Sequence, residues 1–180
     1  MKTQVALSAI GRDRPGIVAG LTKVLFEKGC NLEDSSMTLL KGDFAVQLLV
    51  TLPEGFTVAQ LSDAVHSVAD AMGLTTVMRE LKPEDVQPAG TALPYTLIVY
   101  GGDRPGIVYK VTKAAAGHGL NITDLRTHVT GDATKPVYTL SMDVEVPDVA
   151  AAKAFAGELD GLRAELQVDI TFHPVEAEEL

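Results

Sequence analysis

The stretch Asp13-Arg14-Pro15-Gly16-Ile17-Val18 decides the fold, because the same six residues return as Asp103-Arg104-Pro105-Gly106-Ile107-Val108. The offset from position 13 to position 103 is 90 residues, and the same offset carries Asn31 onto Asn121. Self-similarity at a fixed offset indicates duplicated structural units, and this offset has the size of a small domain. The sequence therefore predicts two copies of one domain.

The residues around the first copy predict a strand followed by a helix. Apolar and polar residues alternate over 3–10, as in a half-buried strand. Pro15 has the fixed φ and the missing N–H that suit the first position of a helix. The helix is expected to end before Gly29, a typical C-cap residue. Its apolar stripe consists of Ile17, Val18, Leu21, Val24 and Leu25.

Two more strands, a second helix and a final strand complete the unit. The segments 32–40 and 44–52 are typical of strands joined by a tight hairpin turn. Thr57 and Gln60, three residues apart, predict a capping box at the start of the second helix. A last strand is expected over 74–81. The order strand, helix, strand, strand, helix, strand is that of a ferredoxin-like α+β sandwich.

The second copy repeats this order, with a strand over 95–100, a helix from Ile107, Asp148 as the N-cap of the next helix, and a last strand over 168–172. The predicted fold class is therefore α+β, with two ferredoxin-like βαββαβ sandwiches in tandem. Prolines and few apolar residues between the copies are typical of a linker. The predicted parts are the first domain 1–82, the linker 83–92, the second domain 93–175 and an acidic tail 176–180.

Composition restricts the function classes. The chain carries 15 Lys and Arg against 24 Asp and Glu, a net charge of −9. Nucleic-acid binders usually show a basic patch, so direct binding to DNA or RNA is not expected. No apolar run reaches the length of a membrane span, and the N-terminus lacks the apolar core of a signal peptide. Cys30 is the only cysteine, which excludes an intrachain disulfide. The expected location is the cytoplasm.

The repeated turn joins a strand to the N-terminus of a helix. Backbone N–H groups there are unpaired, and the helix dipole adds a partial positive charge. A carboxylate is therefore favoured beside Gly16, Ile17 and Val18, and glycine lets a small ligand approach the backbone. Asp13 can offer a carboxylate to an ammonium group, and Arg14 can pair with an acidic partner.

Asn31 and Asn121 follow the first helix of each copy, and an amide that donates and accepts suits a zwitterionic amino acid. Within one unit the turn and the asparagine are expected at opposite ends of the helix, so a shared site would form between two units placed side by side. Each motif alone is an ordinary helix-end signal. Their repetition favours a ligand or contact role, since folding alone would tolerate many substitutions.

Enzyme motifs are absent from the sequence. It contains no Gly-x-Ser-x-Gly, phosphate loop, Gly-x-Gly-x-x-Gly or His-Glu-x-x-His. Cys30 is interpreted as a small packing residue rather than a nucleophile. The four histidines lack the paired spacing of a metal site. No catalytic residue, metal or cofactor is expected, and the chain is predicted not to be an enzyme.

The repeated motif, followed by a helix and Gly-x-Asn-Leu/Ile-x-Asp, resembles the ACT domain, a small-molecule-binding regulatory module of amino-acid metabolism. Two copies filling a chain of this length resemble the glycine cleavage system transcriptional repressor family. The resemblance covers nearly the whole chain. It implies a βαββαβ fold, amino-acid ligands held at interfaces between domains, and action through a partner transcription factor rather than by holding DNA.

The resemblance also implies which residues bind the ligand, which is expected to be a small amino acid such as glycine or serine. They come from the strand-to-helix turn and from the residue that opens the second strand. These are Asp13, Arg14, Gly16, Ile17, Val18 and Asn31, then Asp103, Arg104, Gly106, Ile107, Val108 and Asn121.

The predicted function is an amino-acid-binding regulator, acting on transcription of glycine cleavage or one-carbon metabolism through a protein partner. Homo-oligomerisation is expected, because exposed sheet edges and helix faces can pack against those of another copy of the chain. Two alternatives stay open. One is a ligand-free assembly module whose turns hold only contacts between domains. The other is a regulatory subunit of an amino-acid metabolic enzyme.

Overall fold

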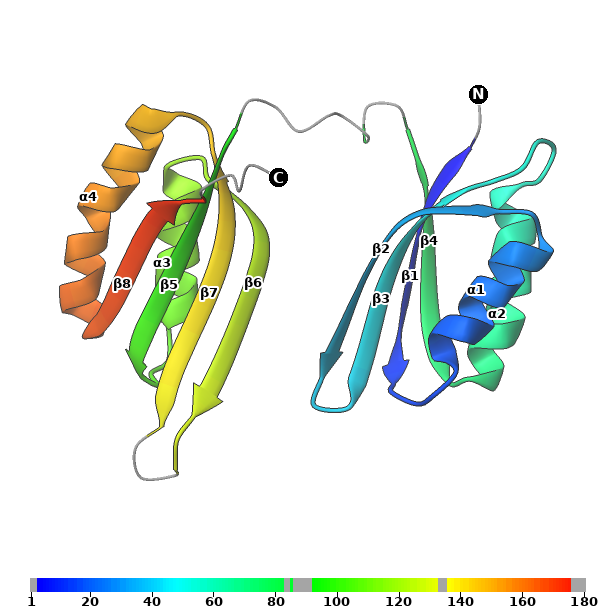
Figure 1. Cartoon of the computed structure of the whole chain (residues 1–180), viewed down its shortest axis with the longest axis horizontal. Helices are drawn as coiled ribbons and strands as arrows, with labels where there is room; N and C mark the ends of the chain where they lie inside the picture. Colours follow the sequence, from blue (N-terminus) through cyan, green and yellow to red (C-terminus); the bar gives the residue numbers. More distant parts are fainter. Residues whose placement is uncertain (1–2, 83–84, 86–91, 133–135, 176–180) are drawn as a thin grey trace. The chain divides into compact units, whose positions relative to one another are not determined.

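The computed structural model describes residues 3–82, 85, 92–132 and 136–175. The chain divides into two compact units, Met1–Pro88 and Ala89–Leu180. Each is a four-stranded antiparallel sheet with two helices on one face (Figure 1). The predicted fold class, two ferredoxin-like sandwiches in tandem, is confirmed. The expected linker, except residues 85 and 92, and the expected acidic tail lie outside the described residues.

The first unit has the predicted order of elements, and the central strand β1 carries much of its core. The elements are β1 (Gln4–Arg12), α1 (Ile17–Glu27), β2 (Asn31–Leu40), β3 (Asp43–Thr51), α2 (Val58–Ala71) and β4 (Leu74–Leu81). The strands lie in the order β2-β3-β1-β4. The alternating residues Val5, Leu7 and Ala9 of β1 are fully buried, because β1 has neighbours on both sides and helices above it.

Strand β2 is the uncovered edge of the first sheet, and all ten of its residues are exposed. Met37 and Leu39 lie on the same sheet face as the buried Phe44 and Val46 of β3, yet they are 57% and 54% exposed. The helices therefore cover the centre of the sheet and leave the apolar face of β2 accessible.

The second unit repeats the arrangement. Its elements are β5 (Leu93–Gly102), α3 (Ile107–Gly117), β6 (Asn121–Thr130), β7 (Val137–Val146), α4 (Val149–Leu166) and β8 (Val168–Pro174). The strand order is β6-β7-β5-β8. Alternate residues of β7 are buried, and Phe155 of α4 packs edge-on against Phe172 of β8 with ring centroids 5.0 Å apart.

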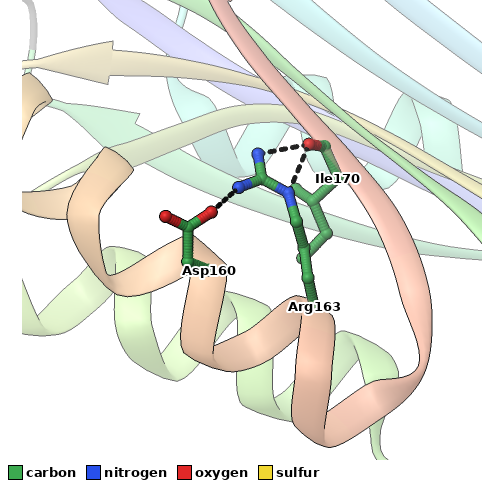
Figure 2. A network of polar contacts seen from close by, with 3 residues as sticks. All are labelled: Asp160, Arg163 and Ile170. Atoms are coloured by element: carbon green, nitrogen blue, oxygen red, sulfur yellow. Dashed lines mark hydrogen bonds and ion pairs between the residues drawn. The ribbon is translucent and has the colours of Figure 1, made fainter.

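The end of α4 is fixed to the strand that follows it. Gln167 takes the left-handed conformation with φ of 53° and ends the helix. Arg163 donates from Nε to the carbonyl oxygen of Ile170 at 2.9 Å and pairs with Asp160 (Figure 2). One guanidinium therefore links the last turns of α4 to β8.

Both predicted N-caps are confirmed. Thr57 and Gln60 form a reciprocal capping box at the start of α2, with Gln60 Oε1 accepting from the Thr57 backbone N–H at 2.9 Å. Asp148 Oδ1 accepts from the Ala151 backbone N–H at 2.8 Å and caps α4. These contacts satisfy N–H groups that a helix cannot pair internally.

Candidate functional site

The repeated turn has the same backbone conformation in both units. Gly16 and Gly106 are the N-cap residues of α1 and α3, and each has a φ of 95°. Glycine adopts this left-handed conformation without the steric cost of a Cβ atom. The first helix therefore begins at Ile17, and the prediction that Pro15 is its first residue is wrong. Pro15 and Gly16 instead form a turn that precedes the helix.

The N-termini of α1 and α3 differ from those of α2 and α4. Thr57 and Asp148 cap α2 and α4 with side-chain oxygens. Gly16 and Gly106 make no side-chain cap, and the first turns of α1 and α3 contain no acidic residue. The backbone N–H groups there keep their capacity to donate, and the positive end of the helix dipole faces outward. This arrangement can bind a carboxylate.

Two hydrogen bonds hold the turn of the first unit. The backbone N–H of Asp13 donates to the carbonyl oxygen of Gly42, in the β2–β3 hairpin, at 2.8 Å. Arg14 Nη2 donates to the carbonyl oxygen of Ala71, the last residue of α2, at 3.1 Å. Instead of the acidic partner suggested by the sequence, Arg14 contacts a helix C-terminus, where the dipole favours a cation.

The turn of the second unit is held differently. Lys110, in the first turn of α3, pairs with Glu165 near the end of α4, with an Nζ–Oε1 distance of 2.6 Å. Within the part of the chain that the structure describes, Arg104 has no hydrogen-bond or ion-pair partner. The guanidinium of the second turn is therefore available to a ligand or partner.

Asn31 and Asn121 open β2 and β6, and each donates to a glutamate. Asn31 Nδ2 lies 2.7 Å from Glu33 Oε1, and Asn121 Nδ2 lies 3.0 Å from Glu145 Oε2. Both strands shift register two residues after the asparagine, between Leu32 and Asp34 and between Ile122 and Asp124, and such bulges re-aim nearby side chains. An amide oxygen beside a carboxylate offers acceptors to an ammonium group. Sequence reasoning missed both glutamates, although Glu33 stands only two residues from Asn31.

Within each unit the turn and the asparagine lie at opposite ends of the sheet, as the sequence predicted. Asn31 faces Thr51 of β3, which in turn faces Gln4 at the start of β1. The turn follows Arg12 at the other end of β1. A strand of this length, at roughly 3.3 Å per residue, separates them by about 26 Å. A single unit therefore does not bring the two halves of the candidate site together.

Ile17 and Ile107 are core residues, being 2% and 1% exposed. Val18 is 44% exposed, so it does not share the burial of the other residues of the apolar stripe. Gly20 of α1 faces α2, as shown by the Met72 side chain that stands against it. Val18 lies on the other flank of α1, which α2 does not cover.

Tyr138 lies beside the strand that enters the second turn, and the sequence pattern did not indicate it. Tyr138 faces Gly101, two residues before Asp103, and is 8% exposed. Burial raises the pKa of the Tyr138 hydroxyl, a hydrogen bond with Thr127 lowers this pKa, and the charge of Asp103 raises it. The registers of β7 against β5 and against β6 bring these residues together.

Away from the turns, the described residues also form hollows, one of them between α3 and α4 and lined by Lys110, His118, Glu158 and Glu165. None of their helices is long and apolar enough to cross a membrane, and no three of their His, Cys, Asp or Glu side chains form a group that could hold a metal ion. A shallow hollow on the uncovered face of the first sheet lies between Asp34 and Arg79, away from the repeated turn.

The model of the ACT domain family matches residues 3–79 and 96–173. The chain belongs to this family, as its repeated turns implied. The glycine cleavage system transcriptional repressor of Escherichia coli is 25% identical over 153 residues, which cover 83% of this chain and 77% of that protein. A UPF0237 protein of Methanopyrus kandleri is 38% identical over 88 residues, 48% of this chain and 94% of that one. The crystal structure of an unknown protein from Galdieria sulphuraria matches with a TM-score of 0.86 and 28% identity, covering 98% of this chain and all of that chain.

Proposed function

We propose that this ACT-domain regulatory protein senses a small amino acid and regulates transcription of glycine cleavage or one-carbon metabolism through a protein partner. The observation that carries the proposal is the pair of uncapped N-termini of α1 and α3, each behind a left-handed glycine. The other two helices are capped by their own side chains. Among the four helices of the described residues, open N-termini therefore occur at the two repeated turns, and binding small amino acids is the function of ACT regulatory domains.

In the proposed binding mode, the ligand carboxylate accepts hydrogen bonds from the backbone N–H groups at the start of α1 or α3. The ligand ammonium group binds an asparagine and its glutamate, such as Asn121 and Glu145. The two halves are about 26 Å apart within a unit, so the asparagine comes from another ACT unit. A ligand that bridges two units favours one arrangement of them, and the partner binds that arrangement.

The partner is proposed to be a protein rather than DNA. The net charge of −9 opposes direct binding to the phosphate backbone. The E. coli relative is named for repressing transcription of the glycine cleavage system, and the present chain is proposed to act on the same process, with glycine or serine as its signal.

A thermal-shift screen of the full chain against free amino acids, including glycine and serine, tests the proposal. A ligand at a hundredfold excess over its Kd adds about 2.7 kcal/mol, which raises the midpoint by roughly 5–10 °C for a chain of this size. The shift should shrink in Asn31→Ala and Asn121→Ala. It should persist in Asp63→Asn, a control on the exposed surface of α2.

The absence of a shift with every amino acid would contradict the sensor and favour the ligand-free assembly module. The oligomeric mass of the Asn31→Ala and Asn121→Ala variants in solution then tests the assembly module. If these residues hold an interface, their replacement should change the oligomeric state. Affinity capture with and without the ligand tests the output. Ligand-dependent recovery of a transcription factor supports the proposal, whereas recovery of an amino-acid metabolic enzyme favours the regulatory-subunit alternative.

A further inference from the structure

A hollow of about 590 Å³ lies between α3 and α4 in the second unit. Its floor is apolar, because Ala114 of α3 and Leu162 of α4 line it and are only 7% and 8% exposed. The ring of Tyr109 also lines the hollow. Small-molecule sites of proteins commonly have volumes of roughly 300–1,000 Å³ and occur between helices. The hollow therefore has the size and the apolar surface of a small-ligand site.

The corresponding place in the first unit is more closely packed. Gly20 of α1 stands 90 residues before Lys110, and the Met72 side chain stands against it. The buried Val24 stands where α3 has Ala114. A long side chain has therefore replaced Gly20 and a short one has replaced Val24. These two exchanges leave space between α3 and α4.

One lysine in the hollow carries an uncompensated charge. Lys110 pairs with Glu165, with an Nζ–Oε1 distance of 2.6 Å, so these two charges offset each other. Lys113 lies on the same side of α3, with its Nζ atom 5.7 Å from the centre of the Tyr109 ring. It has no ion-pair partner among the described residues.

The corresponding lysine of the first unit does have a carboxylate partner. Lys23 Nζ lies 3.7 Å from Glu27 Oε1. Ninety residues later, these two positions are occupied by Lys113 and Gly117. Glycine at position 117 removes the carboxylate and leaves room beside the ammonium group. In a chain with a net charge of −9, a lysine without a carboxylate partner favours an anionic ligand group.

A carboxylate stands at the other end of the hollow. Glu158 Oε2 accepts a hydrogen bond from His118 Nε2 at 2.7 Å, because a carboxylate can only accept. The His118 ring packs edge-on against the buried Phe155, with ring centroids 5.8 Å apart. The imidazole therefore holds Glu158 in place and leaves its Oε1 atom to a ligand donor. Lys113 and His118 are five residues apart on α3, about 7.5 Å along the helix axis.

We propose that this hollow binds a small zwitterion whose carboxylate and ammonium groups are separated by an apolar body, such as an ω-amino acid or a short peptide with free ends. The carboxylate binds Lys113, the ammonium group binds Glu158, and the apolar body covers Ala114 and Leu162. An α-amino acid is too short to reach both ends, because its two charged groups share one carbon atom. The site is therefore separate from the repeated turns and does not rest on the proposed function.

Three probes with equal chain length test the two charged ends: ω-aminooctanoate, octanoate and octylamine. The charges of extended ω-aminooctanoate lie about 9 Å apart. We would titrate each probe into the full ¹⁵N-labelled chain and follow the amide signals of Gly117 on α3 and Leu162 on α4. The zwitterion is expected to bind about three- to fivefold more tightly than either probe with a single charge, the effect of one partly exposed ion pair.

Charge-neutral variants assign the two ends. Lys113→Gln should weaken ω-aminooctanoate binding about three- to fivefold and leave octylamine within about twofold. Glu158→Gln should weaken ω-aminooctanoate to the same extent and leave octanoate within about twofold. Its amide oxygen still accepts from His118, so the hollow keeps its shape. Lys23→Gln is the matched control in the first unit and should change neither.

Two outcomes would overturn the inference. One is equal binding of the three probes, which would mean that only the apolar floor attracts them. The other is the absence of saturable shifts at Gly117 and Leu162. Neither outcome bears on amino-acid binding at the repeated turns, which the thermal-shift screen tests separately.

Discussion

The Arg14 side chain reaches the C-terminus of α2, where its Nη2 atom lies 3.1 Å from the carbonyl oxygen of Ala71, 57 residues along the chain. In the second unit a link between the two helices runs from Lys110 to Glu165, near the end of the 18-residue helix α4. Each helix with an open N-terminus is therefore anchored to the other helix of its unit, although by different residues. The anchor fixes the N–H groups that a carboxylate would meet.

Arg14→Met should destabilise the first unit by about 0.5–1 kcal/mol, because it removes one exposed hydrogen bond to a helix C-terminus. Arg104→Met should change the free energy of unfolding by less than about 0.5 kcal/mol, as is usual for a surface residue that, like Arg104, has no partner among the described residues. Urea denaturation of the full chain measures both. Equal losses in the two variants would contradict the assignment of an anchor to Arg14.

Gly16→Ala should cost about 1–2 kcal/mol, because an L-residue pays this penalty in the left-handed region. An alanine Cβ at position 16 would have no neighbouring atom within 4 Å. The loss of stability would therefore come from the backbone conformation alone. Gly102→Ala is the matched control, with the same open space and no left-handed φ. Thermal unfolding followed by circular dichroism should show a clear drop for Gly16→Ala and almost none for Gly102→Ala.

The fold could be predicted because its signals are local and occur twice. The alternation of Val5, Leu7 and Ala9 specifies the buried face of β1 without knowledge of the other strands. The caps at Thr57 and Asp148 involve residues only three positions apart. Such patterns involve residues only a few positions apart, so their spacing in the sequence is enough to predict which of them come into contact.

Contacts between distant residues could not be predicted in this way. The hydrogen bond from Arg14 to Ala71 depends on where α2 ends relative to the turn, and the proximity of Tyr138 to Asp103 depends on strand register. Val18 is apolar and suitably spaced, yet spacing does not show which flank of a helix its neighbours cover. The ligand-binding role of the twelve site residues remains a prediction.

Gly157→Ala and Gly161→Ala should each stabilise the second unit by about 1 kcal/mol, the difference in helix propensity between the two residues. Both glycines lie inside α4, and no neighbouring atom lies within 4 Å of the position that a Cβ atom would take. Gly20→Ala in α1 is the contrast, since its Cβ would press on the end of the Met72 side chain, which must move and so offsets part of the gain. Calorimetry should show higher midpoints for the α4 variants, and an equal gain in Gly20→Ala would contradict this packing.

Cys30 should behave as a packing residue with low reactivity. Burial raises the pKa of its thiol above the ordinary value of 9.0, so less of the reactive thiolate is present at a given pH. A raised pKa in the folded state means that this group's contribution to stability is complete below pH 9 and is lost as the pH rises through the folded-state pKa. Iodoacetamide should therefore alkylate the native chain more slowly at pH 8 than the chain unfolded in urea. The fall in stability above pH 9 should be smaller in Cys30→Ala. Alkylation of the native chain at the unfolded rate would instead indicate an open, activated thiol beside Asn31.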